Sequence, residues 1–378
     1  MKNIKLHITA PKQRCDINVG PGIFSDLGFE VRRILGGSTR TIVIISNARV
    51  SGHYGTVVSR SLRNADFRIK HWLMGDGERY KSMRTLERAL AFLSQAQLER
   101  NDAILALGGG VVGDLAGLAA ALHLRGIGLL QAPTTLLAQI DASIGGKTAV
   151  NTGVGKNLVG TFYQPRGIWI DTTTLKTLPE RELTSGWCEA VKHGAVGDRG
   201  LFLNTYEFLR SCSTREQLAE PPESLIRAQC AFKARIVSHD ERENVDRFDG
   251  KSRRILNFGH TTAHALETAT HYRQFRHGEA VGYGMLVAGE ISLRLGLLPS
   301  SELELLRDAV RLCGQLPRAD NVDRESIVRA LAHDKKRMHG QIKWILLERI
   351  GKGRIIDGKE VTSRLLRSSL QAGLRSNL

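Results

Sequence analysis

Short apolar runs alternate with amphipathic stretches along the first 175 residues of the chain. The runs TIVIIS (41–46), RIKHWLM (68–74), AILAL (103–107) and IGLLQA (127–132) have the length of buried strands. Residues 83–99, MRTLERALAFLSQAQLE, instead place their apolar side chains at helical spacing. Strands that alternate with helices predict a parallel sheet covered by helices, so we expect an α/β, Rossmann-like domain in this part of the chain.

The two ends of this pattern differ from its centre. At the N-terminus, the alternating segments IKLHI and CDINV predict a hairpin added at the edge of the sheet. After about Leu178, strand-like runs nearly disappear and helical periodicity dominates. The segment SSELELLRDAVRLCG begins with serines that can cap a helix and ends at Gly314, a typical helix stop. We therefore expect two domains, an α/β domain over 1–177 and a mostly α-helical domain over 178–378.

Composition narrows the class of protein without identifying it. The 378 residues carry a formal net charge of +16, but the charges are scattered and no zinc-finger or RNA-binding pattern occurs, so we expect no nucleic-acid partner. No apolar run reaches the length of about 18 residues that predicts a membrane span. The five cysteines form no CxxC pair, and the N-terminus lacks the pattern of a signal peptide. Both features favour a cytoplasmic protein.

The stretch AILALGGGVVGDLAG follows a predicted strand and opens a predicted helix. Gly108, Gly110 and Gly113 fit the pattern G-x-G-x-x-G, whose glycines let the backbone approach a pyrophosphate at a helix N-terminus. The acidic residue expected about 20 positions later, which would hold a ribose, is missing. The turn also follows a later strand rather than the first one. We interpret it as a nucleotide site outside the standard dinucleotide pattern, with close packing alone as the alternative.

Residues 131–165 form a polar, glycine-rich stretch in which two lysines stand among glycines. Lys147 and Lys156 can each act with bare backbone N–H groups in binding a phosphate or a carboxylate. Asn157 lies directly beside the second lysine. The alternative is a solvated surface loop, but the apolar residues that flank both lysines favour an anion site.

Four of the twelve histidines fall between positions 260 and 277. His260 and His264 are four residues apart and share one helical face, a spacing that metal ligands use. His277 stands at the predicted start of another helix and can supply a third ligand. Glu189, in SGWCEAVKHG, is the candidate acid, because two histidines and a carboxylate with an open position recur in catalytic zinc sites. Surface or core histidines without a ligand role are the alternative for each residue taken alone.

Taken together, these stretches resemble 3-dehydroquinate synthase, the sugar phosphate cyclase family of the shikimate pathway. The resemblance runs from GDGERYKS to HDKKRMHGQIKWILL. It rests on GGGVVGDLAG, QAPTTLLAQIDASIGGKTAVN, GKNLVGTFYQP, LPERELTSGWCEAVKHG, LNFGHTTAHALE and HGEAVGYGM, which follow the order of the family. It implies a Rossmann-like nucleotide-binding α/β domain followed by a mostly α-helical domain that binds metal and substrate.

The resemblance also implies two cofactors, NAD and a zinc ion that Co2+ can replace. Zinc would be held by Glu189, His260 and His277, so that His264 would face the substrate instead. NAD would be bound by residues of the glycine-rich turn and of neighbouring loops, namely Glu78, Lys81, Gly109, Gly110, Val111, Asp114, Thr134, Thr135, Asp141, Lys156, Thr177 and Glu182.

The remaining implied residues meet the substrate. The implied catalytic groups are Lys147, Lys156, Lys192 and His264. The implied substrate contacts are Arg125, Asn157, Lys233, Arg253, Asn257 and Lys343. Arg125 would reach the site of a neighbouring subunit, which implies a homodimer.

Three positions depart from the family pattern or stay open. The insertion NVDRFDGKS leaves Arg253 and Arg254 as alternatives for the substrate arginine. The additional phosphate lysine is one of Lys335, Lys336 and Lys343. Asn47 ends a predicted strand where many members of the family carry Asp, so contacts to the adenosine of NAD are expected to differ.

The implied reaction converts 3-deoxy-D-arabino-heptulosonate 7-phosphate into 3-dehydroquinate and phosphate, which makes the protein a carbon–oxygen lyase acting on phosphate. NAD transiently oxidises a hydroxyl, phosphate leaves by β-elimination, the hydride returns, and an intramolecular aldol step closes the ring. The excess of basic residues fits the steering of an anionic substrate. Two alternatives stay open: a sister cyclase that uses sedoheptulose 7-phosphate or an amino analogue, and, less favoured, a metal-dependent polyol dehydrogenase, which has no need of phosphate-binding lysines.

Overall fold

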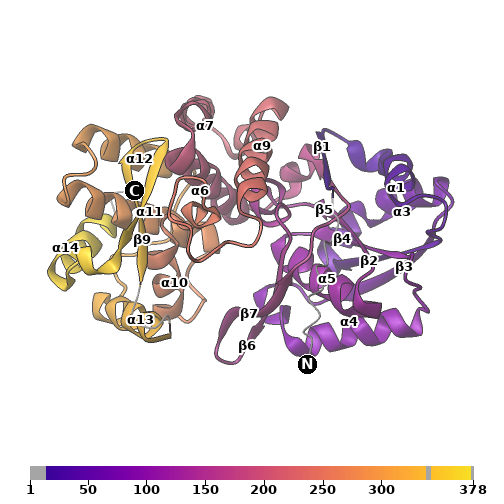
Figure 1. Ribbon diagram of the computed structural model, residues 1–378. Coiled ribbons are helices and arrows are strands. Elements are labelled where there is room, and N and C mark those ends of the chain that lie inside the picture. Colours follow the sequence, from indigo (N-terminus) through magenta and orange to yellow (C-terminus); the bar gives the residue numbers. More distant parts are fainter. Residues whose placement is uncertain (1–13, 338–341, 376–378) are drawn as a thin grey trace, which may run out of the picture.

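The computed structural model describes residues 14–337 and 342–375 of the chain, and in this part an α/β half lies beside a helical half (Figure 1). The α/β half is built on a six-stranded sheet with the strand order β1-β8-β5-β4-β2-β3. All neighbouring strands of this sheet run parallel. The strands are β1 (Asp16–Gly20), β2 (Thr41–Asn47), β3 (Arg68–Met74), β4 (Ala103–Gly108), β5 (Gly128–Pro133) and β8 (Gly167–Asp171). The four strands expected between residues 41 and 132 are therefore confirmed.

Helices cover both faces of the sheet, because alternate residues of its buried strands point to opposite sides. In β2, Val43 and Ile45 belong to the core under α4 and α5, whereas Ile42 and Ile44 belong to the core under α1 and α3. The covering helices are α1 (Leu27–Leu35), α3 (Thr56–Asn64), α4 (Met83–Gln95) and α5 (Gly110–Leu122). This two-sided burial explains why β2 and β4 have continuous apolar sequences.

Two expectations about the ends of elements need correction. CDINV is an edge strand, as expected, but β1 pairs in parallel with β8 over Asp16–Gly20 and Gly167–Asp171. Its proposed hairpin partner, IKLHI, lies outside the described residues. The serines of SSELELLRDAVRLCG do not cap α12 (Ser300–Leu312), because Pro299 is the N-cap and the two serines are already helical.

The polar, glycine-rich stretch that contains Lys147 and Lys156 has more regular secondary structure than expected. It forms the antiparallel hairpin β6 (Lys147–Thr152) and β7 (Gly155–Phe162), which extends below the sheet toward the helical half (Figure 1). The chain enters the hairpin through Gly145 and Gly146, whose φ angles of 105° and 68° strain any residue with a Cβ. At Gly160 a Cβ would lie 2.1 Å from the carbonyl oxygen of Thr148, so the two strands approach too closely for a side chain there.

The second half is mostly helical, as expected. Its helices are α6 (Glu180–Gly197), α7 (Arg199–Ser211), α8 (Arg215–Leu218), α9 (Glu223–His239), α10 (His260–Ala269), α11 (His277–Arg294), α12, α13 (Arg324–Arg337) and α14 (Ser363–Gly373). An unexpected antiparallel pair, β9 (Lys343–Arg349) and β10 (Lys352–Asp357), packs among them. Among the described helices, none is both long and apolar enough to cross a membrane.

One large hydrophobic core holds the helical half together. It contains nearly every apolar side chain of α6 and α11, and it also includes Leu136, Ile140 and Ile170 from the α/β half. The core therefore continues across the expected boundary between residues 177 and 178, and the division of the chain into two domains stays a prediction.

Candidate active site

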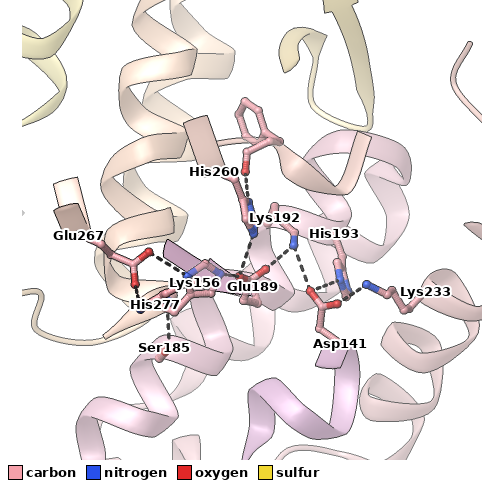
Figure 2. A network of polar contacts seen from close by, with 12 residues as sticks. Asp141, Lys156, Ser185, Glu189, Lys192, His193, Lys233, His260, Glu267 and His277 are labelled. Carbon is pink, nitrogen blue, oxygen red and sulfur yellow. Dashed lines mark hydrogen bonds and ion pairs between the residues drawn. The ribbon is translucent and has the colours of Figure 1, made fainter. Parts of the chain in front are cut away.

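The candidate site lies where α6, α10 and α11 meet the segment η5 (Ala138–Ala142) of the α/β half (Figure 2). All residues of α6 from Leu183 to Val196 are buried. A helix that is buried all round must satisfy its polar side chains internally. The charged groups of Glu189 and Lys192 are therefore held inside the protein and directed at partners on neighbouring elements.

Glu189, His260 and His277 form a cluster of potential metal ligands. One ligand atom from each residue lies within 4.8 Å of the others. The Nε2 atoms of His260 and His277 lie 3.8 Å and 3.5 Å from the same carboxylate oxygen of Glu189. The structure thus brings together the three residues that were expected as zinc ligands.

The outer ring nitrogens of both histidines show that this donor set fits a metal. Nδ1 of His260 lies 3.2 Å from the carbonyl oxygen of Phe258, and Nδ1 of His277 lies 3.4 Å from a carboxylate oxygen of Glu267. Because both partners can only accept, each Nδ1 donates a hydrogen bond to its partner, which leaves each Nε2 as the atom that can bind a metal beside Glu189. Burial, followed by the charge of Lys192, also holds the pKa of His260 well below its ordinary value, which keeps that ring neutral.

The other two histidines of the cluster lie in different surroundings. The ring of His264 lies 5.6 Å from that of His260 and 5.9 Å from that of His277, and the residue is exposed. His264 also belongs to a second group of potential ligands with Glu267 and His277. His271 is exposed in the loop between α10 and α11, with a φ of 52°. The role of His264 at the substrate side stays a prediction.

Asp141 of η5 carries a buried network of charges next to the metal cluster. Its carboxylate receives Lys233 and lies 3.1 Å from Nζ of Lys192, which also pairs with Glu189. Burial alone raises the pKa of Asp141, but the two lysines hold it well below its ordinary value. Burial also lowers the pKa of Lys233 to about 8 despite the nearby carboxylate. Lys192 is therefore the physical link between the metal cluster and Asp141 (Figure 2).

A second polar group joins the start of the β6–β7 hairpin to the segment after α9. Lys147 forms an ion pair with Glu243, whose carboxylate also accepts a hydrogen bond of 2.9 Å from the side-chain amide of Asn257. Arg253 is only 2% exposed and donates to the carbonyl oxygen of Gly145. These contacts place Lys147, Asn257 and Arg253 around one region, and their role as substrate contacts stays a prediction.

The structure favours Arg253 over Arg254 as the residue that faces this region. Arg254 donates to the carbonyl oxygen of Val245 and stacks its guanidinium on Phe248, within the insertion loop. For the additional lysine, Lys343 pairs with Asp357 at 3.0 Å on β10. The side chains of Lys335 and Lys336 lie outside the described part of the chain, so the choice among the three lysines stays open.

The predicted nucleotide residues gather at the ends of β4 and β5. Gly109 is the N-cap of α5, and no side chain caps that helix, which leaves its first N–H groups available to an anion. The N–H of Thr134 donates to the carbonyl oxygen of Gly108, which sets Thr134 and Thr135 beside the glycine turn. Gly110 and Val111 form the first turn of the same helix.

The β6–β7 hairpin closes one side of this nucleotide region. Nζ of Lys81 pairs with Asp114 and donates to the side-chain oxygen of Asn157. Glu78 accepts a hydrogen bond of 2.7 Å from Asn151 of the hairpin. Two predicted NAD residues, Glu78 and Lys81, thus contact the hairpin directly, and a third, Asp114, is connected to it through Lys81.

Other predicted residues have separate surroundings. Thr177 accepts or donates a hydrogen bond of 2.5 Å with Tyr54, and Glu182 pairs with Arg276 at 3.0 Å. Arg125 is exposed after the C-terminal end of α5. Asn47 donates to Asp76, so a carboxylate is present near the end of β2 although the strand itself ends in an amide.

Sequence reasoning missed three residues of this network: His193, Glu243 and Glu267. Nε2 of His193 lies 3.4 Å from Asp141, and Glu267 is a buried partner of Lys156 and His277. Glu267 could have been found from its spacing, since it lies one turn after His264 on the histidine face of α10. Glu243 and His193 have partners that are distant in sequence, which no local pattern indicates.

Solved structures with the same fold define the class of this protein. The 2-epi-5-epi-valiolone synthase of Streptomyces hygroscopicus subsp. jinggangensis, described with NAD+ and Zn2+ bound, is 27% identical, with a TM-score of 0.85 over 97% of this chain and 99% of that one. A 2-deoxy-scyllo-inosose synthase complexed with carbaglucose-6-phosphate, NAD+ and Co2+ is 26% identical, with a TM-score of 0.81 over 95% and 96%. A glycerol dehydrogenase of Schizosaccharomyces pombe, 17% identical with a TM-score of 0.63 over 98% and 92%, shares the fold alone. The fold is that of the sugar phosphate cyclases.

The sequence itself narrows this class to one family. It matches the 3-dehydroquinate synthase N-terminal family over residues 71–185 and the 3-dehydroquinate synthase C-terminal family over residues 186–337. A 3-dehydroquinate synthase of Nostoc punctiforme is 38% identical over 97% of this chain and 98% of its own length, and one of Geobacter sp. strain M21 is 42% identical over 88% and 89%. The chain belongs to the 3-dehydroquinate synthase family.

Proposed function

We propose that this protein converts 3-deoxy-D-arabino-heptulosonate 7-phosphate into 3-dehydroquinate and phosphate, as a carbon–oxygen lyase. One observation carries the proposal: the buried ammonium group of Lys192 contacts both Glu189 of the metal cluster and Asp141 of the nucleotide-binding half. A metal that binds substrate oxygens and a nucleotide that exchanges a hydride must act on the same molecule in this reaction. Lys192 lies between the candidate metal cluster and the nucleotide-binding half, where such a molecule would have to bind.

The cofactors in this proposal are NAD and zinc, with Co2+ as a substitute. Glu189, His260 and His277 would hold the metal, and the glycine turn before α5 would hold the pyrophosphate of NAD. When bound, NAD supplies a reversible hydride acceptor and zinc supplies a Lewis acid for substrate oxygens. Two cyclases with this fold carry NAD+ together with Zn2+ or Co2+, which supports the same pair here.

The chain's own residues bind and orient the two anionic ends of the substrate. Arg253 and Lys233 are buried cations that suit a carboxylate. Lys147 begins the hairpin, and Asn257 shares the partner Glu243 with it. In the absence of substrate, Glu243 neutralises Lys147. An arriving anion would compete with Glu243 for Lys147, so the lysine would be available only when the substrate replaces that carboxylate.

Proton handling falls to groups next to the metal cluster. Lys192 is charged, because Asp141 and Glu189 offset the effect of burial and raise the pKa of its ammonium group. A charged, buried lysine can stabilise an oxygen that becomes negative but cannot accept a proton from it. His264, which is exposed beside the metal ligands, is the group that can take or return a proton at the substrate.

The assembly and location form part of the same proposal. A homodimer would let the exposed Arg125 of one subunit approach the site of the other. A reducing cytoplasm agrees with the cysteines, all five of which are free.

Product analysis with candidate substrates tests the proposed reaction. The zinc-loaded protein with NAD should release phosphate from the heptulosonate phosphate and form 3-dehydroquinate, identified by mass spectrometry, while NADH does not accumulate. Sedoheptulose 7-phosphate and the amino analogue serve as parallel substrates. Faster turnover of either would assign a sister cyclase, and stoichiometric NADH without phosphate release would assign a dehydrogenase.

A further inference from the structure

Glu267 is a buried carboxylate that the proposed reaction does not use. It lies on α10, seven residues after His260, and it is only 2% exposed. Its two oxygens face different partners: Oε1 lies 3.0 Å from Nζ of Lys156, and Oε2 lies 3.4 Å from Nδ1 of His277 (Figure 2). Burying a carboxylate is costly unless it is paired, so both contacts are needed to keep this group inside the protein.

The contact with His277 distinguishes the two metal-binding histidines. His260 donates its outer N–H to the neutral carbonyl of Phe258, whereas His277 donates to the charged carboxylate of Glu267. A carboxylate partner fixes the orientation of a ligating imidazole and makes its other nitrogen more basic. His277 is also less buried than His260, with a side chain that is 36% exposed against 15%. Glu267 therefore supports the histidine that the surrounding protein constrains least.

The contact with Lys156 connects this support to the β6–β7 hairpin. Lys156 belongs to β7 of the α/β half, 111 positions before Glu267 in the sequence. Its ammonium group also lies 4.3 Å from the centre of the Tyr272 ring, in the loop after α10. The side chain of Lys156 thus spans from the hairpin to the helical half and ends on the carboxylate that orients His277.

We propose that Glu267 is a positioning residue that sets the metal affinity through Nδ1 of His277, and that Lys156 holds the hairpin to the same carboxylate. The proposal rests on the metal cluster of the proposed function. It predicts that metal retention and the position of the hairpin depend on one side chain.

The alternative to a positioning role is that Glu267 itself binds the metal. His264, Glu267 and His277 also form a group of potential ligands, in which Glu267 would bind a metal directly. A positioning role and a ligand role predict different metal contents. With Glu267 as a positioning residue, the wild-type protein binds one zinc ion per chain and Glu267→Gln still binds one, but more weakly.

Metal competition provides the first test. Zinc affinity would be measured against a chromophoric chelator for the full-length wild-type protein, Glu267→Gln and the matched control Glu290→Gln. Glu290 is also a buried, ion-paired carboxylate of the helical half, but its partners are Arg294 and Arg307, away from the cluster. We expect Glu267→Gln to lose about 10–100-fold in zinc affinity, the usual cost of removing such a partner, with no comparable loss in the control.

Several outcomes of this measurement would overturn the proposal. Wild-type zinc affinity in Glu267→Gln would do so, as would an equal loss in both variants, which would indicate general destabilisation. Two zinc ions in the wild type and one in Glu267→Gln would show that Glu267 is itself a ligand. Failure of the wild type to bind zinc at all would instead contradict the proposed function.

Limited trypsin digestion tests the link to the hairpin, since trypsin cleaves after Lys156. Without its carboxylate partner, Lys156 should be released from the helical half, and cleavage at the Lys156–Asn157 bond should become several times faster in Glu267→Gln than in Glu290→Gln. Equal cleavage rates in the two variants would remove the hairpin from the proposal. In Lys156→Met, zinc affinity should stay at or above that of the wild type, because His277 keeps the carboxylate.

Discussion

Helix α6 and the β6–β7 hairpin each place lysines in the candidate site, but they do so in opposite ways. Lys192 of α6 is 1% exposed and is fixed between two carboxylates. Lys147 and Lys156 of the hairpin have side chains that are 49% and 28% exposed, and each has one carboxylate partner on another element. The buried helix thus fixes its lysine in one position, whereas the hairpin holds its lysines by single, partly exposed ion pairs, which in the proposed function an anionic substrate could replace.

The largest expected effect comes from removing one of the histidines that would bind the metal next to Glu189 of α6. His260→Ala and His277→Ala should each fail to retain zinc after treatment with a chelator, because each leaves only two ligands. His264→Ala should retain one zinc per chain yet be nearly inactive. Metal analysis after zinc titration measures all three. Loss of zinc in His264→Ala together with retention in His277→Ala would instead place the metal on the i,i+4 pair His260 and His264.

His271→Ala is the control for this series. Its side chain is exposed in the loop after α10, so both zinc content and activity should remain those of the wild type. Any loss of metal in this variant would show that histidine substitutions disturb the helix generally.

Lys192→Ala and Lys147→Ala compare the two elements directly. Each should reduce kcat/KM by about 10²–10³, since each removes a charge-assisted contact in the reaction. The stability cost should differ. Lys192→Ala leaves Glu189 buried without a lysine partner and Asp141 with Lys233 as its remaining lysine, at about 3–5 kcal/mol, whereas Lys147→Ala breaks a partly exposed pair, at about 0–1 kcal/mol. Chemical denaturation measures this difference. Equal stability of the two variants would contradict the contrast between helix and hairpin.

A smaller effect is expected from pH. Burial lowers the pKa of Lys233 to about 8, although Asp141 opposes this and Lys192 and Arg253 add to it. Lys233 is therefore charged below pH 8 and neutral above it, and KM for the anionic substrate should rise as pH increases through 8. Lys233→Arg should shift this break to higher pH in a profile of kcat/KM. The free energy of unfolding should increase over the same rise in pH, because between pH 8 and the ordinary pKa of 10.5 the unfolded chain binds more protons at this lysine than the folded chain does.

The smallest effect separates two neighbouring arginines. Arg253→Ala should weaken substrate binding, because its buried guanidinium faces the turn into the hairpin. Arg254→Ala, which alters only the insertion loop, should leave KM nearly unchanged. Steady-state kinetics on the pair would decide the choice, and a larger effect in Arg254→Ala would reverse it.

The strands of the α/β half could be predicted because both sheet faces are buried, so β2 and β4 have apolar sequences with clear ends. The β6–β7 hairpin could not, because its outer strand is exposed and its glycines suggest a loop. The pair β9–β10 was missed for a different reason: KWILLER has a buried apolar centre, but it is a short run within a helical background. A short apolar run therefore predicts a strand only where neighbouring runs repeat the pattern of a sheet.

The same limit applies to the candidate site. Glu189, His260 and His277 could be named because their motifs are compact and resemble those of a known family. The partners that give these residues their properties lie far away along the chain: Asp141 is 92 positions from Lys233, and Lys156 is 111 positions from Glu267. Helical spacing predicts which side chains share one face of a helix. Only the tertiary structure shows which residues of other elements contact that face.

The pairing of β1 with β8 affects when the six-stranded sheet can be completed during synthesis of the chain. Asp16 lies opposite Gly167, and the carboxylate of Asp171 accepts hydrogen bonds from the backbone N–H groups of Gly22 and Phe24. The first described strand thus leaves the ribosome about 150 residues before its partner. Such distant contacts form slowly, because the intervening chain must first be ordered. During synthesis, β1 therefore remains without its partner until β8 has been made. In that interval its backbone would be exposed to a chaperone that binds unpaired strands.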